Sequence, residues 1–374
     1  MRNLLNTLFV LSEDVYLSLE GENVVVLRES ETVGRFPLHT LEGILCFSYK
    51  GASPALMGAC AERGILLSFY SPQGRFLCQT TGTAQGNVLL RREQFRCADS
   101  PLACRDLANG FLTGKLYNAR WVLERATRDH ALRVDAARLK SASIALSGAL
   151  RTLPAQPDTD SLRGVEGAAA QQYFAVFDEL ILQNKHDFFF RSRSRRPPLD
   201  RVNALLSFVY TLLANECGAA LRGCGLDPYV GYLHTDRPGR ASLALDLMEE
   251  LRPVLGDRFA LSLINSRQIS PKQFDLRENG AVYLNDDGRK AVLAGWQAKK
   301  RETLTHPFLG EKLYWGLLPY VQALLLARYL RGDLDDLDAI CADLAERYNA
   351  AYKELKESGD VDLSQYEYAY DISK

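Results

Sequence analysis

Residues 231–253 have the sequence GYLHTDRPGRASLALDLMEELRP, in which one of the chain's five histidines precedes a short turn and a predicted helix. On that helix Asp246 and Glu249 are three positions apart, so their carboxylates lie on one face, a turn apart. The leucines and the methionine of the helix are expected to hold it against a core. His234 precedes the turn, and an imidazole presented with carboxylates forms part of a site for Mg²⁺, Mn²⁺ or Zn²⁺. A further ligand must come from another segment.

The best candidate for that further ligand is Glu166, which stands in the apolar, small-residue sequence LRGVEGAAAQQYF. A carboxylate in such surroundings needs a partner, because an unpaired charge is costly to bury. Each residue also has a simpler interpretation. Glu166 fits a solvated acid near a helix start, His234 a half-buried histidine, and Asp246 with Glu249 a solvated helix face. The metal-site hypothesis depends on all four occurring together.

The composition predicts an ordinary soluble protein with more than one core. The 374 residues exceed what one hydrophobic core usually serves, and 47% hydrophobic with 24% charged residues is typical of globular proteins. We expect no membrane span, since no apolar run reaches the roughly 18 residues needed to cross a bilayer. Glu13 and Asp14 interrupt the N-terminal apolar run, which favours a strand over a signal peptide. Eight cysteines without CxxC or zinc spacing indicate reduced thiols and a cytoplasmic location.

The expected fold class is α+β. Residues 1–95 show several short apolar strands and one helix, which begins at Ser53-Pro54. Residues 96–336 show apolar positions at helical spacing and are expected to form an all-α domain, with Ser161 capping the helix that carries Glu166. Residues 337–374 form an acidic tail with nine acids and four bases. Its end fits either an edge strand or a disordered segment.

A second chemical feature is the run of arginines at positions 191–201. Five arginines in these eleven residues could neutralise phosphates of a nucleic-acid backbone, and the guanidinium fork matches phosphate geometry. A loop that is merely charged and exposed is the alternative. Its members are Arg191, Arg193, Arg195, Arg196 and Arg201.

Four stretches together resemble the CRISPR-associated adaptation endonucleases, the large integrase subunits that insert new spacers into CRISPR arrays. They are LRGVEGAAAQQYF, RSRSRRPPLDRVNALLSFVYTLL, LDPYVGYLHTDRPGRASLALDLMEELRP and HPFLGEKLYWGLLPYVQALLLARYLRGDLDD. The blocks PPLDRVNALLSF and HPFLGEK resemble the type I-C branch. The resemblance covers about residues 1–336, and the acidic tail has no counterpart in it.

The resemblance implies a homodimer formed through the β-rich domain and a helical catalytic domain that binds Mg²⁺ or Mn²⁺. It places the catalytic metal ligands on Glu166, His234 and Glu249, with Asp246 as a further acid near the metal. It also implies double-stranded DNA as substrate, both spacer precursor and leader–repeat, and a small ferredoxin-like partner subunit. The candidate DNA-binding residues are Arg191, Arg193, Arg196, Asn203, Tyr210 and Arg252. For the last three, contacts that support the metal ligands are the alternative.

The implied reaction is phosphoryl transfer, in which a DNA 3′-hydroxyl attacks a backbone phosphate. Two other functions stay open at this point. One is a stand-alone metal-dependent DNA nuclease, and the other is a DNA-binding scaffold without catalysis.

Overall fold

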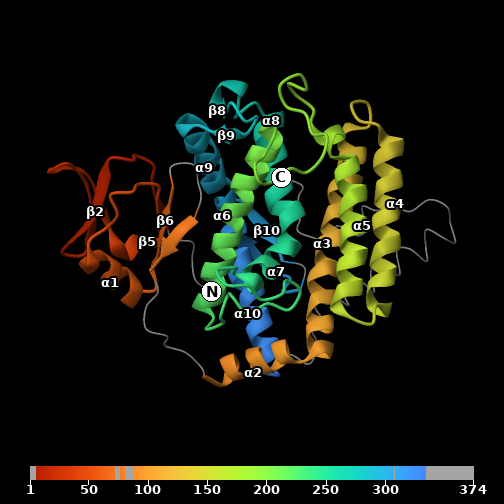
Figure 1. Cartoon of the computed structure of the whole chain (residues 1–374), viewed down its shortest axis with the longest axis horizontal. Coiled ribbons are helices and arrows are strands. Elements are labelled where there is room, and N and C mark those ends of the chain that lie inside the picture. Colours follow the sequence, from red (N-terminus) through yellow and green to blue (C-terminus); the bar gives the residue numbers. More distant parts are fainter. Residues whose placement is uncertain (1–5, 72–75, 81–87, 307, 334–374) are drawn as a thin grey trace.

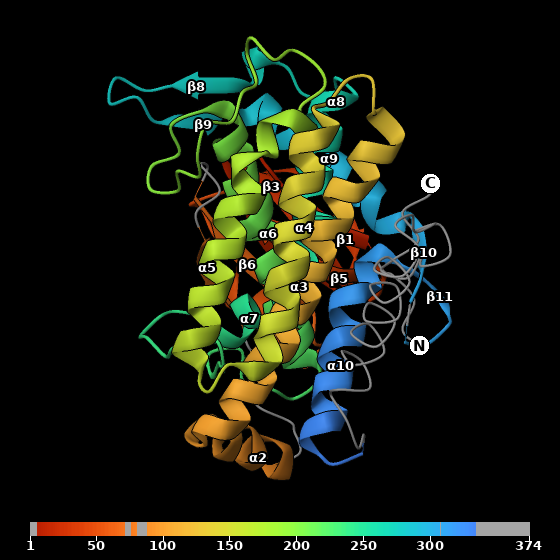
Figure 2. The ribbon, with the colours of Figure 1, turned by 90° about the vertical axis from the view of Figure 1, so that its right-hand side faces the viewer.

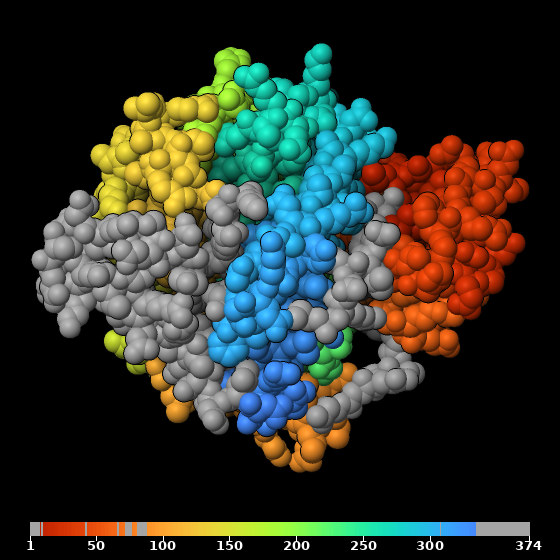
Figure 3. All heavy atoms as spheres, turned by 180° about the vertical axis from the view of Figure 1, so that it is seen from behind, coloured from red at the N-terminus to blue at the C-terminus, as the bar shows by residue number. Residues whose placement is uncertain are grey.

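The computed structural model describes residues 6–71, 76–80, 88–306 and 308–333, so the predicted tail lies outside the described residues. In these residues the strands β1–β7 come first and a mainly helical part follows (Figure 1). The predicted α+β content is confirmed. Seen from behind, the first strands project to one side of the helical part (Figure 3).

The first part of the described chain contains two sheets and one helix. In the sheet of order β1-β5-β6-β7, β7 alone is antiparallel to its neighbour; β2-β3-β4 is an antiparallel meander. The strands are β1 Asn6–Val10, β2 Val15–Glu20, β3 Asn23–Arg28, β4 Glu31–Pro37, β5 Leu41–Cys46, β6 Leu66–Tyr70 and β7 Phe76–Gln79. Helix α1, Pro54–Glu62, begins as predicted, because the Ser53 side chain accepts a hydrogen bond from the Leu56 N–H.

The sheets share a core of their own and also contact the helices. Leu17, Ile44 and Leu67 are fully buried in the first core. Phe47, just after β5, stacks on Tyr70 with ring centroids 4.9 Å apart and lies 6.4 Å from the ring of Phe208 in the helical part. The aromatic contact therefore fixes the first sheet against the second core.

Helices form most of the remaining structure, and the central one is α3. The α-helices are α2 Val88–Asp99, α3 Pro101–His130, α4 Ala136–Thr152, α5 Thr159–Ala175, α6 Arg201–Gly223, α7 Ser242–Leu251, α8 Arg258–Asn265, α9 Asp286–Arg301 and α10 Leu318–Leu330, with a π-helical turn at Arg252–Asp257. Short 3₁₀ turns occur at Leu38–Thr40, Leu153–Ala155, Phe177–Leu180, Pro271–Gln273 and Trp315–Leu317. Helix α3 packs against α4, α5 and α7, and Figure 2 shows α3, α4 and α5 from the side.

Three expectations about the helical part were wrong in detail. It is not all-α, because two hairpins interrupt it: β8 Phe274–Leu276 with β9 Val282–Leu284, and β10 Thr303–Thr305 with β11 Lys312–Tyr314. Helix α2 begins at Val88, before the expected boundary at residue 96, and was missed because Val88, Leu89 and Phe95 are exposed and obscure the helical period. Asp158, not Ser161, caps α5, since the Asp158 carboxylate accepts a hydrogen bond from the Ser161 N–H.

The expectation about apolar runs also needs a correction. Helix α6 is the one helix among the described residues that is long and apolar enough to cross a membrane. However, 61% of its apolar window is buried inside the protein, and it packs against α7, α8 and α10. Its apolarity is therefore accounted for by core packing.

Candidate active site

Asp246 organises the loop that precedes α7. Its side chain is fully buried and accepts hydrogen bonds from three successive backbone N–H groups, those of Tyr232 at 2.7 Å, Leu233 at 3.0 Å and His234 at 2.9 Å. The loop can approach this closely because residue 231 is glycine. A Cβ there would lie 2.6 Å from Ser242 Cβ and 2.8 Å from the His234 carbonyl oxygen. Asp246 and this glycine together fix the position of His234.

The His234 ring lies between Asp246 and Glu249, two of the three acids of α7. Its Nδ1 is 2.6 Å from Asp246 Oδ1, and its Nε2 is 4.0 Å from Glu249 Oε1. When Nδ1 donates to the carboxylate, Nε2 carries the lone pair and faces Glu249. A histidine held this way by a carboxylate is the usual arrangement of an imidazole metal ligand. Asp246 is thus a support for His234, whereas sequence analysis treated it only as an acid near the metal.

Glu249 is 3% exposed and contacts two cations. Arg252 Nη2 lies 2.9 Å from its Oε1, and Lys115 Nζ lies 2.6 Å from its Oε2. Burial raises the pKa of Glu249, but the charges of Arg252 and Lys115 outweigh burial and lower the pKa to about 2. The residue is therefore a carboxylate at neutral pH, although it is almost completely enclosed.

Lys115 brings the third predicted ligand, Glu166, into the same cluster. The lysine lies on α3, is 8% exposed, and its ammonium also donates to Glu166 Oε1 on α5. Helix α7 comes close to α3 because residue 114 is glycine. In any other residue at this position, the Cβ would lie 2.7 Å from Glu250 Cγ. The Asn118 amide donates to the Glu250 carbonyl oxygen at 2.8 Å and joins the same two helices.

The predicted ligands Glu166, His234 and Glu249 thus come together from α5, a loop and α7. Within the described part of the chain, no three His, Cys, Asp or Glu side chains form a ready metal cluster. The physical reason lies in Lys115, whose ammonium separates Glu166 from Glu249. The donor set of two carboxylate oxygens and one imidazole nitrogen does fit Mg²⁺ or Mn²⁺, provided that the ammonium moves.

A buried network supports the cluster from the side of Arg252. The guanidiniums of Arg252 and Arg193 both lie over the Tyr210 ring, 4.9 Å and 5.3 Å from its centroid. The Tyr210 hydroxyl donates to Asp257, which also accepts from Tyr173 at 3.1 Å. Burial raises the pKa of Asp257 to about 6, against the lowering effects of its hydrogen bonds and of Arg252. Tyr210 and Arg252, predicted as DNA contacts, are therefore used inside the protein.

The remaining predicted DNA-binding residues have different surroundings. Arg191 and Arg196 are exposed, and Arg191 lies 5.4 Å from the centroid of the Phe189 ring. Arg193 turns inward, where it donates to Asn203 Oδ1 at 2.6 Å and to Ser207 Oγ at 3.1 Å. Asn203 itself is fully buried, and its amide donates to the Ser192 carbonyl oxygen at 2.8 Å. Arg193 and Asn203 therefore shape the arginine loop, while Arg191 and Arg196 face solvent.

Lys115 was not among the residues proposed from sequence, because a lysine is usually expected on the solvent face of a helix. The helical period contained the signal. Positions three and four residues away on either side, Phe111, Leu112, Asn118 and Ala119, are all buried, so Lys115 lies on the inner face. Asp257 and Tyr173 were also missed, and their partners are too far away in sequence to be paired by spacing.

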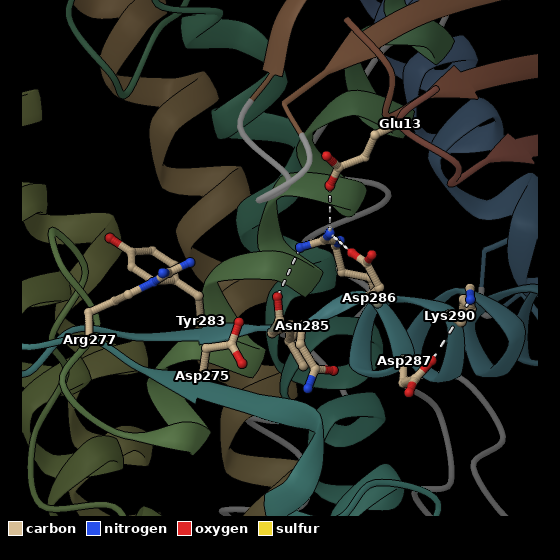
Figure 4. A pocket seen from close by; sticks show the side chains of 10 residues that line it. Glu13, Asp275, Arg277, Tyr283, Asn285, Asp286, Asp287 and Lys290 are labelled. Atoms are coloured by element: carbon tan, nitrogen blue, oxygen red, sulfur yellow. Dashed lines mark hydrogen bonds and ion pairs between the residues drawn. The ribbon is translucent and has the colours of Figure 1, made fainter. Parts of the chain in front are cut away.

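A pocket lies apart from this cluster, and none of the predicted site residues lines it. It has a volume of about 510 Å³ and lies between the turn after β1 and the β8–β9 hairpin with α9 (Figure 4). Arg289 lines it and donates to the Leu284 carbonyl oxygen at 3.0 Å and to Asp286. Three ion pairs join acids and bases of its lining, those of Arg289 with Asp286 and with Glu13 and that of Lys290 with Asp287.

Comparison with known proteins shows the family to which the chain belongs. Residues 8–298 match the family described as CRISPR associated protein Cas1. The chain is 51% identical over 335 residues to CRISPR-associated endonuclease Cas1 1 of Chlorobaculum tepidum, covering 90% of this chain and 98% of the relative. Its fold is similar to that of a casposase bound to an integration product, with a TM-score of 0.77 at 23% identity over 90% of this chain and 93% of the other. It is also similar to a chain of a Cas6-RT-Cas1–Cas2 complex, with a TM-score of 0.74 at 22% identity over 89% of this chain and 36% of the other. The protein therefore belongs to the Cas1 family of CRISPR-associated endonucleases.

Proposed function

We propose that this endonuclease is a metal-dependent integrase that inserts short DNA fragments into a CRISPR array by phosphoryl transfer. The observation that carries the proposal is the convergence of Glu166, His234 and Glu249 from three separate segments. Carboxylate oxygens with one imidazole suit Mg²⁺ or Mn²⁺, the ions most often used for phosphate chemistry. Family membership makes DNA the substrate class.

Glu166, His234 and Glu249 would hold the ion, which when bound would polarise the scissile phosphate and stabilise the charge that builds on its oxygens. Asp246 keeps His234 Nε2 directed toward Glu249 through the Nδ1 contact. Arg252 holds Glu249 from the other side and keeps it ionised. A DNA 3′-hydroxyl then forms the new P–O bond while the backbone 3′-oxygen leaves, so no covalent protein intermediate is required.

The DNA would follow the exposed arginines of the loop 191–196. Arg191 and Arg196 face solvent and match phosphate in charge and geometry, without reading bases. Likeness in fold to the casposase bound to an integration product and to the Cas1–Cas2 complex supports a DNA target and a small partner subunit. We further propose that this subunit is ferredoxin-like and that two copies of the chain associate through residues 1–95. We also propose that the protein belongs to the type I-C branch of the family and that it is located in the cytoplasm.

The test is strand transfer of a short duplex into a plasmid carrying a leader–repeat. It is run with Mg²⁺ or Mn²⁺, with and without the small partner subunit, on the native protein and on His234→Ala. We expect transfer that needs the partner and is lost in the variant. Glu166→Ala and Glu249→Gln are expected to lose transfer while they still bind DNA. Transfer that survives Glu166→Ala would refute the ligand assignment.

A charge-reversal pair tests the DNA path separately. The double substitution Arg191→Glu and Arg196→Glu should weaken DNA binding. It should also make the slope of the logarithm of the binding constant against the logarithm of salt concentration shallower, by the equivalent of about two phosphate contacts. Arg28→Glu is a matched control, since Arg28 is an exposed arginine on β3 far along the chain from the loop. Equal effects of the pair and the control would contradict the proposed path.

The two other functions have distinct outcomes in the same assays. A stand-alone nuclease would degrade generic DNA without the partner, and degradation would still depend on His234. A non-catalytic scaffold would bind DNA but show no metal-dependent chemistry, and Glu166→Ala would leave its function unchanged. The clustering of three potential ligands at one point favours catalysis over the scaffold.

A further inference from the structure

The ammonium of Lys115 lies between two of the proposed metal ligands. Its Nζ contacts Glu249 Oε2 at 2.6 Å and Glu166 Oε1 on the opposite helix. The side chains of Lys115 and Glu249 are 10% and 4% exposed, so this contact is shielded from water, whereas the Glu166 side chain is 26% exposed and keeps one side of the cluster open to solvent. A single positive charge thus lies between two carboxylates and reduces the repulsion between them.

The two cations at Glu249 are not equivalent. Arg252 contacts Oε1, is stacked over Tyr210, and leaves Oε2 to the lysine. A guanidinium held by stacking has little freedom to move. The lysine ends in a flexible chain with a point charge, and its two partners are the residues that a divalent ion would need. Breaking the two ammonium–carboxylate contacts and forming two metal–oxygen contacts exchanges one cation for another.

We propose that Lys115 is an exchangeable counter-cation, which pairs with Glu166 and Glu249 until a divalent metal ion displaces it. This inference rests on the proposed function. Lys115 competes with the ion for its ligands and therefore sets the metal concentration at which the centre fills. It also prevents the two acids from repelling each other before the ion binds.

The test measures metal affinity directly. Mn²⁺ is titrated by calorimetry into the full-length protein and into Lys115→Met, His234→Ala and the control Lys300→Met. Lys300 is also a buried lysine paired to a carboxylate, Glu216 at 2.9 Å, but lies outside the cluster. We expect Lys115→Met to bind Mn²⁺ on the order of tenfold to a hundredfold more tightly than the native protein, since it removes a competing buried ion pair. Lys300→Met should match the native protein, and His234→Ala should bind weakly.

A second measurement uses only the native protein, in case Lys115→Met does not fold. The acylation rate of each lysine is followed by mass spectrometry with and without Mn²⁺. Displacement predicts that Lys115 becomes more reactive when Mn²⁺ is added and that Lys300 does not change.

Native protein that binds Mn²⁺ while Lys115→Met binds it equally or more weakly would overturn the exchange proposal and leave the proposed function intact. An unchanged reactivity of Lys115 in Mn²⁺-loaded protein would do the same. Folded native protein that binds no Mn²⁺ would overturn the metal-dependent function first, and the exchange with it.

Discussion

Replacing Asp246 by asparagine tests whether a buried carboxylate, rather than the loop sequence itself, fixes His234. The substitution preserves size but removes the charge and one acceptor oxygen. In the native protein the carboxylate accepts four hydrogen bonds, three from backbone N–H groups and one from His234 Nδ1. The asparagine amide would turn an NH₂ group toward some of these donors.

The expected size follows from those contacts. Two of the four hydrogen bonds remain possible at the single amide oxygen, and two are lost. At about 1.5–3 kcal/mol for each bond to a charged group, Asp246→Asn should lower the free energy of unfolding by about 3–6 kcal/mol. The imidazole loses its orienting partner at the same time, so Mn²⁺ affinity should fall by about 10- to 100-fold.

Urea unfolding measures the first effect, and Mn²⁺ calorimetry under conditions where the variant is folded measures the second. Asp275→Asn is a suitable control, because Asp275 is an exposed acid in the separate pocket. If Asp246→Asn matched the native protein in both measurements, the assignment of Asp246 as the support of His234 would be wrong.

Three further substitutions test other contacts. Glu249→Ala leaves the Lys115 ammonium and a guanidinium without their shared carboxylate and should cost about 3–5 kcal/mol in urea unfolding; a loss below 1 kcal/mol would contradict the buried pairing. Gly231→Ala places a Cβ against Ser242 and should cost about 1–3 kcal/mol in thermal unfolding, whereas Gly58→Ala, with open space around it, should be neutral or stabilising. The pKa of Asp257 is higher in the folded protein, about 6, than its ordinary value of 3.8, so the folded state binds this proton more tightly than the unfolded state. Protonation of Asp257 therefore adds to the free energy of unfolding below about pH 4, and this contribution is lost as the pH rises to about 6. In Asp257→Asn the free energy of unfolding should fall by about 3 kcal/mol less than in the native protein between about pH 4 and pH 6. An unchanged dependence of stability on pH would refute the raised pKa.

Local sequence signals predicted the framework well. Several short strands within residues 1–95 were predicted from their apolar runs, and α1 from the Ser53-Pro54 start; both are present. These features depend on neighbours in sequence, which spacing can show. The short hairpins β8–β9 and β10–β11 were not predicted, because three-residue strands carry too few alternations to show a period.

The same difference between local signals and contacts of distant segments applies to the candidate site. The clustering of Glu166 with His234 and Glu249 agrees with the residues proposed from sequence, but that proposal depended on the family resemblance and not on spacing alone. Lys115 lies 51 residues from Glu166 and could be paired with it only through the packing of α3 on α5. The inward turn of Arg193 is equally non-local, since Asn203 and Ser207 on α6 impose it.

Two of the three acids of α7 show how the fold gives different roles to similar residues. Asp246 and Glu249 lie one turn apart on the same helix, and both are buried. Asp246 has the shorter side chain and is saturated by four donors, three of them backbone groups that it cannot release without unfolding the loop. Glu249 contacts only side-chain cations, one of them on a flexible chain. Of these two acids, Glu249 can therefore exchange a partner more readily, which suits it to the proposed role of metal ligand, whereas Asp246 suits the role of support for His234.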